Sequence, residues 1–168
     1  MPKVVLSWGL NLGDRQQTLN RMSAALRILL HDVRASSVYA NEPMYLPDQP
    51  DYWNGIILGT TTLGPFALLR QVKAIEQALG RIARERNGPR EIDLDIVAYG
   101  SLILESEHLQ LPHVSVLERR FVCEPWLEVD PEAVYLGRIP GSQVRISEYL
   151  PTLTDYRLVK VENAAVLF

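Results

Sequence analysis

Cysteine is almost absent from this chain of 168 residues, which carries a single one, Cys123. One thiol can form no disulfide within the chain, and it cannot supply the several thiolates of a cysteine-based zinc site. Such a composition is typical of a reducing cytoplasm, so we expect a cytoplasmic location. We expect Cys123 itself to pack as a small apolar residue.

Long apolar runs are missing as well. The first eight residues, MPKVVLSW, contain too short an apolar run for a secretory signal peptide. No segment reaches the roughly 18 consecutive apolar residues that a membrane-spanning helix needs. We therefore expect neither a signal peptide nor a membrane partner.

An excess of positive charge is the third absence. The formal net charge is −3, so the chain offers no broad electrostatic field for nucleic acid. Its 47% hydrophobic and 22% charged residues are ordinary for a globular protein, and its length is enough to bury a core. We expect one domain over residues 1–168 that acts as a monomer and binds no nucleic acid.

Hydrophobic periodicity predicts the order β-α-β-β-α-β over the first hundred residues. We expect strands at 4–8, 33–40, 52–62 and around 93–97, and helices at 15–30 and 65–79. Pro65 is suited to the start of the second helix and Gly80 to its end. This order is typical of an α+β, ferredoxin-like βαββαβ sandwich. In the C-terminal additions we expect short strands at 102–104 and 109–111, helical segments at 116–123 and 146–150, and a last strand at 156–161.

The most informative stretch is 86–97, RNGPREIDLDIV, which joins a basic loop to an apolar strand with two carboxylates. Side chains alternate along a strand, so Asp93 and Asp95 point to the same face. Two carboxylates on an otherwise apolar strand repel each other and cost desolvation free energy. A divalent cation removes both problems, and Mg²⁺ prefers one or two carboxylates together with phosphate oxygens. The pattern therefore favours a magnesium site.

Arginines cluster immediately before this strand. Arg81, Arg84, Arg86 and Arg90 fall within ten residues, whereas lysine is nearly absent from the chain. A run of charge usually forms a solvated face, and an Asp-x-Asp pair at a strand start is often a cap or a solvated edge. Arginines interrupted by Gly88-Pro89 and followed by two acids are more typical of a phosphate clamp, because guanidinium groups bind phosphate bidentately.

Five further motifs accompany this stretch. In chain order they are GLNLGDR at 9–15, SSVY at 36–39, DQPDYWN at 48–54, IE at 75–76 ahead of GR at 80–81, and LPH at 111–113 ahead of RRFV at 119–122. Together with 86–97, their order resembles that of the 6-hydroxymethyl-7,8-dihydropterin pyrophosphokinases of folate biosynthesis. The resemblance runs from about Val4 to Pro131, is closest over 88–97, and leaves 131–168 as a weakly matched C-terminal extension.

The resemblance implies transfer of the terminal diphosphate of ATP to the hydroxymethyl group of a dihydropterin, with release of AMP. It implies two Mg²⁺ ions held by Asp93 and Asp95, with Arg81 and Arg90 as further catalytic residues. In the pterin site, Tyr52 and Phe121 would stack on the ring and Asn54 would meet its edge, with Asn41, Pro43 and Met44 lining the rest. The implied nucleotide-binding residues are Glu76, Arg84, Arg86, Ile96, His113 and Arg119. For Lys73 two positions are open, a solvated one and one near the adenine.

Five positions depart from the family pattern. Leu10 and Asn41-Glu42 replace a small residue and a Thr-Pro or Thr-Glu pair, while Asn87 and Val114 replace aromatic residues. We expect the two lost aromatics to weaken loop closure or nucleotide packing.

Two other functions compete with the enzyme. The same βαββαβ order serves single-stranded RNA recognition, but a negative chain with two acids on the sheet repels phosphate unless a metal intervenes. A non-catalytic homologue would bind pterin or nucleotide without releasing AMP.

Overall fold

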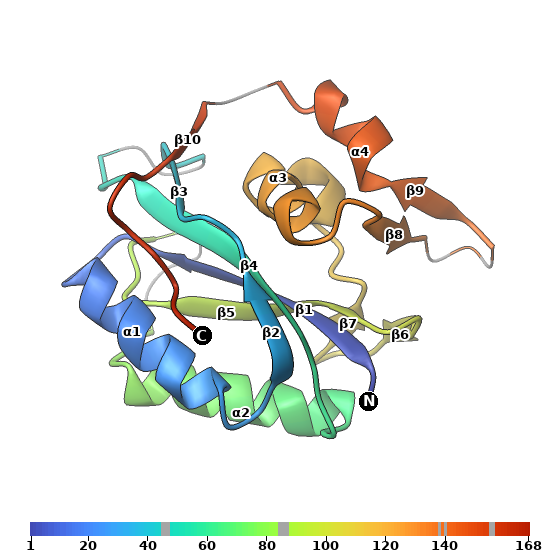
Figure 1. The fold of residues 1–168 in the computed structure, drawn as a ribbon, viewed down its shortest axis with the longest axis horizontal. Helices are drawn as coiled ribbons and strands as arrows, with labels where there is room; N and C mark the ends of the chain where they lie inside the picture. Colours follow the sequence, from blue (N-terminus) through green and yellow to red (C-terminus); the bar gives the residue numbers. More distant parts are fainter. Residues whose placement is uncertain (45–47, 84–87, 138, 140, 155–156) are drawn as a thin grey trace.

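The computed structural model describes residues 1–44, 48–83, 88–137, 139, 141–154 and 157–168. Within these ranges the chain is an α+β protein built on one antiparallel sheet, which confirms the predicted class (Figure 1). The strands of this sheet are β1 (Lys3–Leu10), β2 (His31–Ala35), β3 (Tyr39–Asn41), β4 (Tyr52–Thr60), β5 (Asp93–Tyr99) and β10 (Leu158–Lys160). The α-helices are α1 (Arg15–Leu26), α2 (Pro65–Ala78), α3 (Arg120–Val129) and α4 (Ile146–Tyr149).

Smaller elements follow the sheet's fifth strand along the chain. Two strand pairs lie outside the sheet, β6 (Leu104–Glu105) with β7 (Gln110–Leu111) and β8 (Val134–Leu136) with β9 (Gln143–Arg145). Short 3₁₀ turns occupy Val116–Glu118 and Leu150–Thr152. None of the described helices combines the length and apolar character that crossing a bilayer requires.

In the sheet, β1 lies between β4 and β5. Strand order is β10-β3-β4-β1-β5, with β2 also paired to β4, and β1 runs antiparallel to both of its neighbours. Register aligns Gly9 of β1 with Asn54 of β4 on one side and with Asp93 of β5 on the other. Because directly paired residues point to the same face, this row brings an amide and a carboxylate to either side of a glycine.

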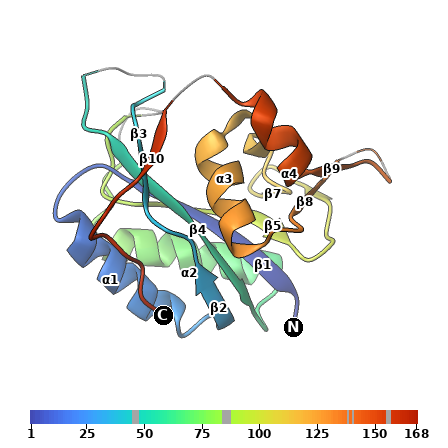
Figure 2. The same cartoon turned by 45° about the horizontal axis from the view of Figure 1, so that its top comes forward.

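Both faces of the sheet are covered (Figures 1 and 2). Alternation along β1 sends Val4, Leu6, Trp8 and Leu10 into a core shared with α1 and α2. Val5 points the other way, into a second core that α3 completes with Val122, Cys123, Trp126 and Val129. Cys123 is fully buried there, as expected for a small apolar residue.

The helix ends follow the sequence closely. Asp14 caps α1, its carboxylate accepting from the Gln17 N–H at 3.0 Å. Pro65 opens α2, and Gly80 follows the helix at φ +90°, where the Arg81 N–H donates to the Glu76 carbonyl at 3.1 Å. Both predicted boundaries of the second helix are therefore confirmed.

The structure corrects the expected elements in several places. The first helix ends at Leu26 rather than at residue 30, and the strand expected over 33–40 is split into β2 and β3. The helix expected over 116–123 is a 3₁₀ turn followed by α3, which continues through Pro125 to Val129. A proline disfavours helix, but burial of Trp126 and Val129 against the sheet outweighs this cost. The β8–β9 pair was not predicted.

Trp8 and Gly55 form a matched pair in the core beneath the sheet. They are register partners, and a Cβ at position 55 would lie 2.5 Å from the Trp8 ring. Trp8 is 2% exposed, so its ring has no room to move. The indole fits because its neighbour has no side chain.

We therefore expect Gly55→Ala to lower the free energy of unfolding by about 1–3 kcal/mol, the usual cost of overpacking. Urea denaturation measures this. Trp8→Leu in the same chain should make Gly55→Ala much less costly, because the clash is removed. Equal costs of Gly55→Ala in the two backgrounds would contradict this account of the pair.

Candidate functional site

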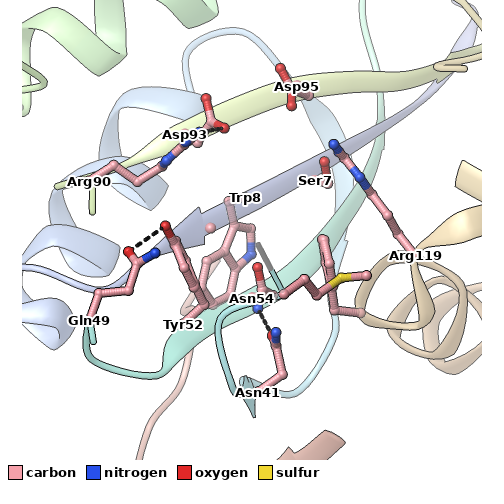
Figure 3. Close-up of a pocket in the computed structure, with 13 residues that line it drawn as sticks. Ser7, Trp8, Asn41, Gln49, Tyr52, Asn54, Arg90, Asp93, Asp95 and Arg119 are labelled. Carbon is pink, nitrogen blue, oxygen red and sulfur yellow. Dashed lines mark hydrogen bonds and ion pairs between the residues drawn. The ribbon is translucent and has the colours of Figure 1, made fainter. Parts of the chain in front are cut away.

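A pocket opens on the α3 side of the sheet, where β1, β4 and β5 lie side by side (Figure 3). Strands, the segment before β4 and the start of α3 all contribute to it. Its lining residues are Ser7, Trp8, Gly9, Asn41, Met44, Gln49, Tyr52, Asn54, Arg90, Asp93, Asp95, Arg119 and Phe121. The polar residues fall into an amide group over β3 and β4 and a charged group over β5.

One half of the pocket is suited to a flat heterocycle. Tyr52 and Phe121 supply aromatic rings, Met44 adds a flexible apolar side chain, and Asn41 and Asn54 supply amides. Aromatic faces with a few convergent polar groups are the usual composition of a small-molecule site. Asn54 has a polar partner within the pocket, since its Nδ2 donates to Asn41 Oδ1.

The other half carries two carboxylates on one strand. The Asp93 and Asp95 side chains are 23% and 31% exposed, and both face the pocket, as the alternation of β5 predicts. Leu94, between them, is fully buried on the opposite face. Asp93 binds Arg81 Nη1 at 2.6 Å through Oδ1 and Arg90 Nη1 through Oδ2. The Asp95 Oδ1 atom lies 3.5 Å from Lys73 Nζ.

These cations decide the ionisation of Asp93. Burial acts to raise the pKa of the Asp93 carboxyl, but the nearby Arg90, Arg81 and Lys73 outweigh burial and lower it. Asp93 is therefore ionised at neutral pH, as a metal ligand must be.

Glu76 joins the same charge network from beneath. The resemblance implied that it binds the nucleotide, but its side chain is only 3% exposed. Its Oε1 accepts from the Leu94 N–H at 2.6 Å and from Lys73 Nζ at 2.9 Å, while Oε2 lies 2.5 Å from Arg81 Nη1. Glu76 therefore ties α2 to β5 and holds Arg81 and Lys73 beside the two aspartates.

The carboxylate pair is compatible with Mg²⁺. In the described part of the chain, no set of three His, Cys, Asp or Glu side chains could enclose a metal. Two partly exposed carboxylates fit an ion that takes its remaining ligands from water and phosphate. Asp95, with one lysine at 3.5 Å, is the more accessible ligand; at Asp93 a metal must compete with two arginines.

His113 and Arg119 border the charged half. Arg119 lines the pocket, with its guanidinium 5.7 Å from the centre of the Phe121 ring. The His113 N–H of the backbone donates to the Val97 carbonyl at 2.9 Å, and its Nδ1 accepts from the Ser115 N–H at 3.2 Å. Burial lowers the pKa of His113, and Arg119 adds to this, while Asp95 opposes it. The ring is therefore neutral at pH 7.

Some expected site residues lie away from the pocket lining. Ile96 is 3% exposed and packs with Leu94 in the core, so its side chain is not available to a nucleotide. Pro43, Glu76, Arg81 and His113 are not among the lining residues, although Glu76 and Arg81 support Asp93 directly. The expectations for Arg84 and Arg86 lie outside the described residues.

Two pocket residues, Ser7 and Gln49, were not predicted. Lys73, for which a solvated position and one near the adenine were both open, bridges Glu76, the Leu94 carbonyl at 2.8 Å and Asp95. Ser7 was detectable, because it is a polar residue on the strand face opposite Leu6 and Trp8. Gln49 and Lys73 carry no such local signal.

Asn11 connects the two halves of the site from outside the pocket. Its side chain is 3% exposed. The Asn11 Nδ2 donates to Gln49 Oε1 at 3.0 Å and to the Pro50 carbonyl at 2.8 Å. The Asn11 Oδ1 accepts from the Arg90 N–H at 2.9 Å. The Tyr52 hydroxyl lies 3.0 Å from Gln49 Oε1 and 2.8 Å from the Gly88 carbonyl. These bonds tie the segment before β4 to the segment before β5.

Comparison with known proteins gives a family match. The family model described as 7,8-dihydro-6-hydroxymethylpterin-pyrophosphokinase (HPPK) matches residues 5–131. A Haemophilus influenzae protein named 2-amino-4-hydroxy-6-hydroxymethyldihydropteridine pyrophosphokinase is 34% identical over 158 residues, covering 93% of this chain and 96% of that protein. The Schizosaccharomyces pombe folic acid synthesis protein fol1 is 39% identical over 155 residues, 84% of this chain. That stretch is only 21% of the fungal protein, so this chain spans about a fifth of that relative's length.

Solved structures show the same fold. A Plasmodium falciparum HPPK-DHPS A437G structure with STZ-DHP matches 90% of this chain and 45% of its own, with a TM-score of 0.65. At 15% sequence identity this likeness concerns the fold alone.

The depressed pKa of His113 predicts a pH dependence of stability. The unfolded chain takes up this proton near pH 6.5, whereas the folded protein takes it up only at lower pH. The free energy of unfolding should therefore fall as pH drops below about 6.5, by at most about 1.4 kcal/mol per pH unit from this group.

His113→Gln should make the decline shallower in urea titrations. The exposed His108 is the matched control, and His108→Gln should leave the slope unchanged. Identical slopes in the parent and His113→Gln would contradict the assignment.

Proposed function

The chain belongs to the 7,8-dihydro-6-hydroxymethylpterin-pyrophosphokinase family, and on that premise we propose that it transfers diphosphate from ATP to 6-hydroxymethyl-7,8-dihydropterin. The hydroxyl oxygen attacks the β-phosphorus, the bond from that phosphorus to the α,β-bridging oxygen breaks, AMP leaves, and the hydroxyl proton is released. The observation that carries the proposal is the row Asn54–Gly9–Asp93 across three strands. This row supports the proposal because it sets an amide beside a carboxylate, so a slot for a heterocycle would lie directly beside a site for phosphate and metal.

The heterocycle slot would hold the pterin ring. Tyr52 and Phe121 would stack on the ring, and Asn54 would bind its edge, with Asn41 and Met44 completing the wall. Pro43, which follows β3 but does not line the pocket, would shape the backbone there. The hydroxymethyl group would then point along the sheet toward Asp95.

The charged half would hold the triphosphate. Asp93 and Asp95 fit Mg²⁺, and two ions bound there would neutralise phosphate charge and acidify the attacking hydroxyl. Arg90 and Arg81 would leave Asp93 for phosphate oxygens, with Arg119 on the opposite wall as a third guanidinium. Positioning and charge stabilisation carry most of the catalysis in phosphoryl-type transfers, so no strong general base is required.

The remaining nucleotide contacts are assigned by position. His113 lies beside the Asp95 end, where its neutral ring would meet a phosphate or ribose oxygen, and Glu76 would act through Arg81. Ile96 would contribute backbone rather than side chain, since it is buried. We assign Arg84 and Arg86 to the phosphates as well, from the family pattern alone.

We also infer that the first five strands and two helices form a ferredoxin-like sandwich. The order β5-β1-β4-β3 with α1 and α2 packed on one face supports this description. Residues after Gly100 add α3 to the other face, where it contributes Phe121 and follows Arg119.

The deciding experiment measures AMP formed from ATP, Mg²⁺ and 6-hydroxymethyl-7,8-dihydropterin. The proposal requires AMP release that depends on both the pterin and the metal. Calorimetric binding of the pterin with no AMP release would identify a non-catalytic homologue instead.

The metal pair gives a first quantitative prediction. Asp95→Asn or Asp93→Asn should lower turnover by on the order of 10²–10³-fold, because charge stabilisation at the transferred group is lost. Pterin binding in the absence of ATP should persist. Asp32→Asn is a control, since Asp32 is exposed in β2 and has φ 50°, which asparagine tolerates. An Asp95→Asn variant with the turnover of the parent would exclude the metal assignment.

The aromatic walls give a second prediction. Tyr52→Ala or Phe121→Ala should weaken pterin binding by about 0.5–1.5 kcal/mol from stacking, with the lost burial added. Affinity for a nonhydrolysable ATP analogue should change little. Phe66→Ala, on the exposed face of α2, serves as the control because Phe66 is 42% exposed and remote from the pocket. Equal losses of pterin and ATP affinity would show that the two rings only support the fold.

A further inference from the structure

The two asparagines of the pocket are joined by a hydrogen bond with a defined donor and acceptor. Asn41 and Asn54 are 3% and 5% exposed, and they lie diagonally across β3 and β4, where Asn41 is paired with Tyr52 and Asn54 with Tyr39. Residues in this relation share a face and are within reach of each other. Asn54 Nδ2 donates to Asn41 Oδ1 (Figure 3).

The direction of this hydrogen bond is set by a backbone carbonyl. Asn41 Nδ2 donates to the Glu42 carbonyl oxygen at 2.8 Å, and a carbonyl oxygen can only accept. The amide of Asn41 is therefore oriented with its own oxygen toward Asn54. That oxygen in turn requires the NH₂ of Asn54, so Asn54 Oδ1 must point away from Asn41.

Gly9 makes room for this oxygen. A Cβ at position 9 would lie 2.9 Å from Asn54 Oδ1, so the oxygen occupies space that any other residue would contest. Both asparagines line the pocket. Among the described residues, no hydrogen bond is made to Asn54 Oδ1, although it belongs to a buried side chain. Because Asn54 lines the pocket, this oxygen is available to accept from a donor on a bound ligand.

We propose that Asn41 is a positioning residue that fixes Asn54 as a hydrogen-bond acceptor and thereby selects substrates whose ring edge carries an N–H donor. The inference rests on the proposed function and extends it to the origin of specificity. A 2-amino-4-oxo pyrimidine edge carries adjacent N–H donors, so it satisfies the oxygen. An analogue without the 2-amino and 4-oxo groups has ring nitrogens that only accept at this edge, so it offers the Asn54 oxygen no donor.

Two substitutions at position 41 separate orientation from packing. Asn41→Leu keeps the approximate volume but accepts no hydrogen bond, so Asn54 is free to turn over. Asn41→Asp keeps an oxygen that accepts from Asn54 whether or not the acid is protonated. If Asn41 only supports the fold, the buried acid should be at least as harmful as leucine.

The test measures affinities for 6-hydroxymethylpterin and for 6-hydroxymethylpteridine, which lacks the 2-amino and 4-oxo groups, by titration calorimetry. The parent should prefer the amino compound by about tenfold or more, equivalent to about 1.4 kcal/mol. Asn41→Leu should reduce this preference to within about threefold, and Asn41→Asp should retain most of it. The affinity of each variant for a nonhydrolysable ATP analogue should stay within about twofold of the parent.

The outcomes separate this inference from the proposed function. A preference that is unchanged in Asn41→Leu, or lost equally in both variants, would overturn the positioning role while the enzyme assignment stands. A parent that binds neither compound would overturn the substrate assignment and this inference with it.

Discussion

Charge balance at one end of β5 is the constraint on which the site depends. Asp93, Asp95 and Glu76 carry three negative charges, and Lys73, Arg81 and Arg90 carry three positive charges in direct contact with them. Such groups can be taken partly out of water only together, because removing one leaves a buried charge without a partner. The network therefore fixes the loop ends around Arg81 and Arg90 against the strand that carries the acids.

A balanced network is also one that can exchange partners. Asp93 already uses both oxygens on arginines, so a cation that binds there must displace at least one of them. The displaced guanidinium then needs an anion, and phosphate oxygens are its best match. In the proposed reaction this exchange would couple metal binding to triphosphate binding, since each would remove the charge that the other leaves unpaired. Glu76, buried beneath the strand, keeps Arg81 nearby throughout.

The sequence predicted the parts of this arrangement that depend on local pattern. Alternation along β5 was enough to place Asp93 and Asp95 together, and Pro65 and Gly80 were enough to bound α2. The burial of Glu76 was not predictable, because it depends on how α2 packs against Leu94, and the bridging role of Lys73 follows from the same packing. The extent of α3 was also underestimated, since its stability comes from Trp126 and Val129 in the second core. The pairing of Asn41 with Asn54 required the register of β3 and β4, which no local motif encodes.

The most direct measurement of the central claim is anomalous diffraction from Mn²⁺ in crystals of the protein with a nonhydrolysable ATP analogue and 6-hydroxymethylpterin. Manganese shares the oxygen ligands of magnesium and scatters anomalously, so it reports the metal positions independently of the assigned chemistry. The account predicts metal peaks at the Asp93 and Asp95 carboxylates, with Arg90 on a phosphate rather than on Asp93. Metal bound elsewhere, with both arginines still on Asp93, would contradict it.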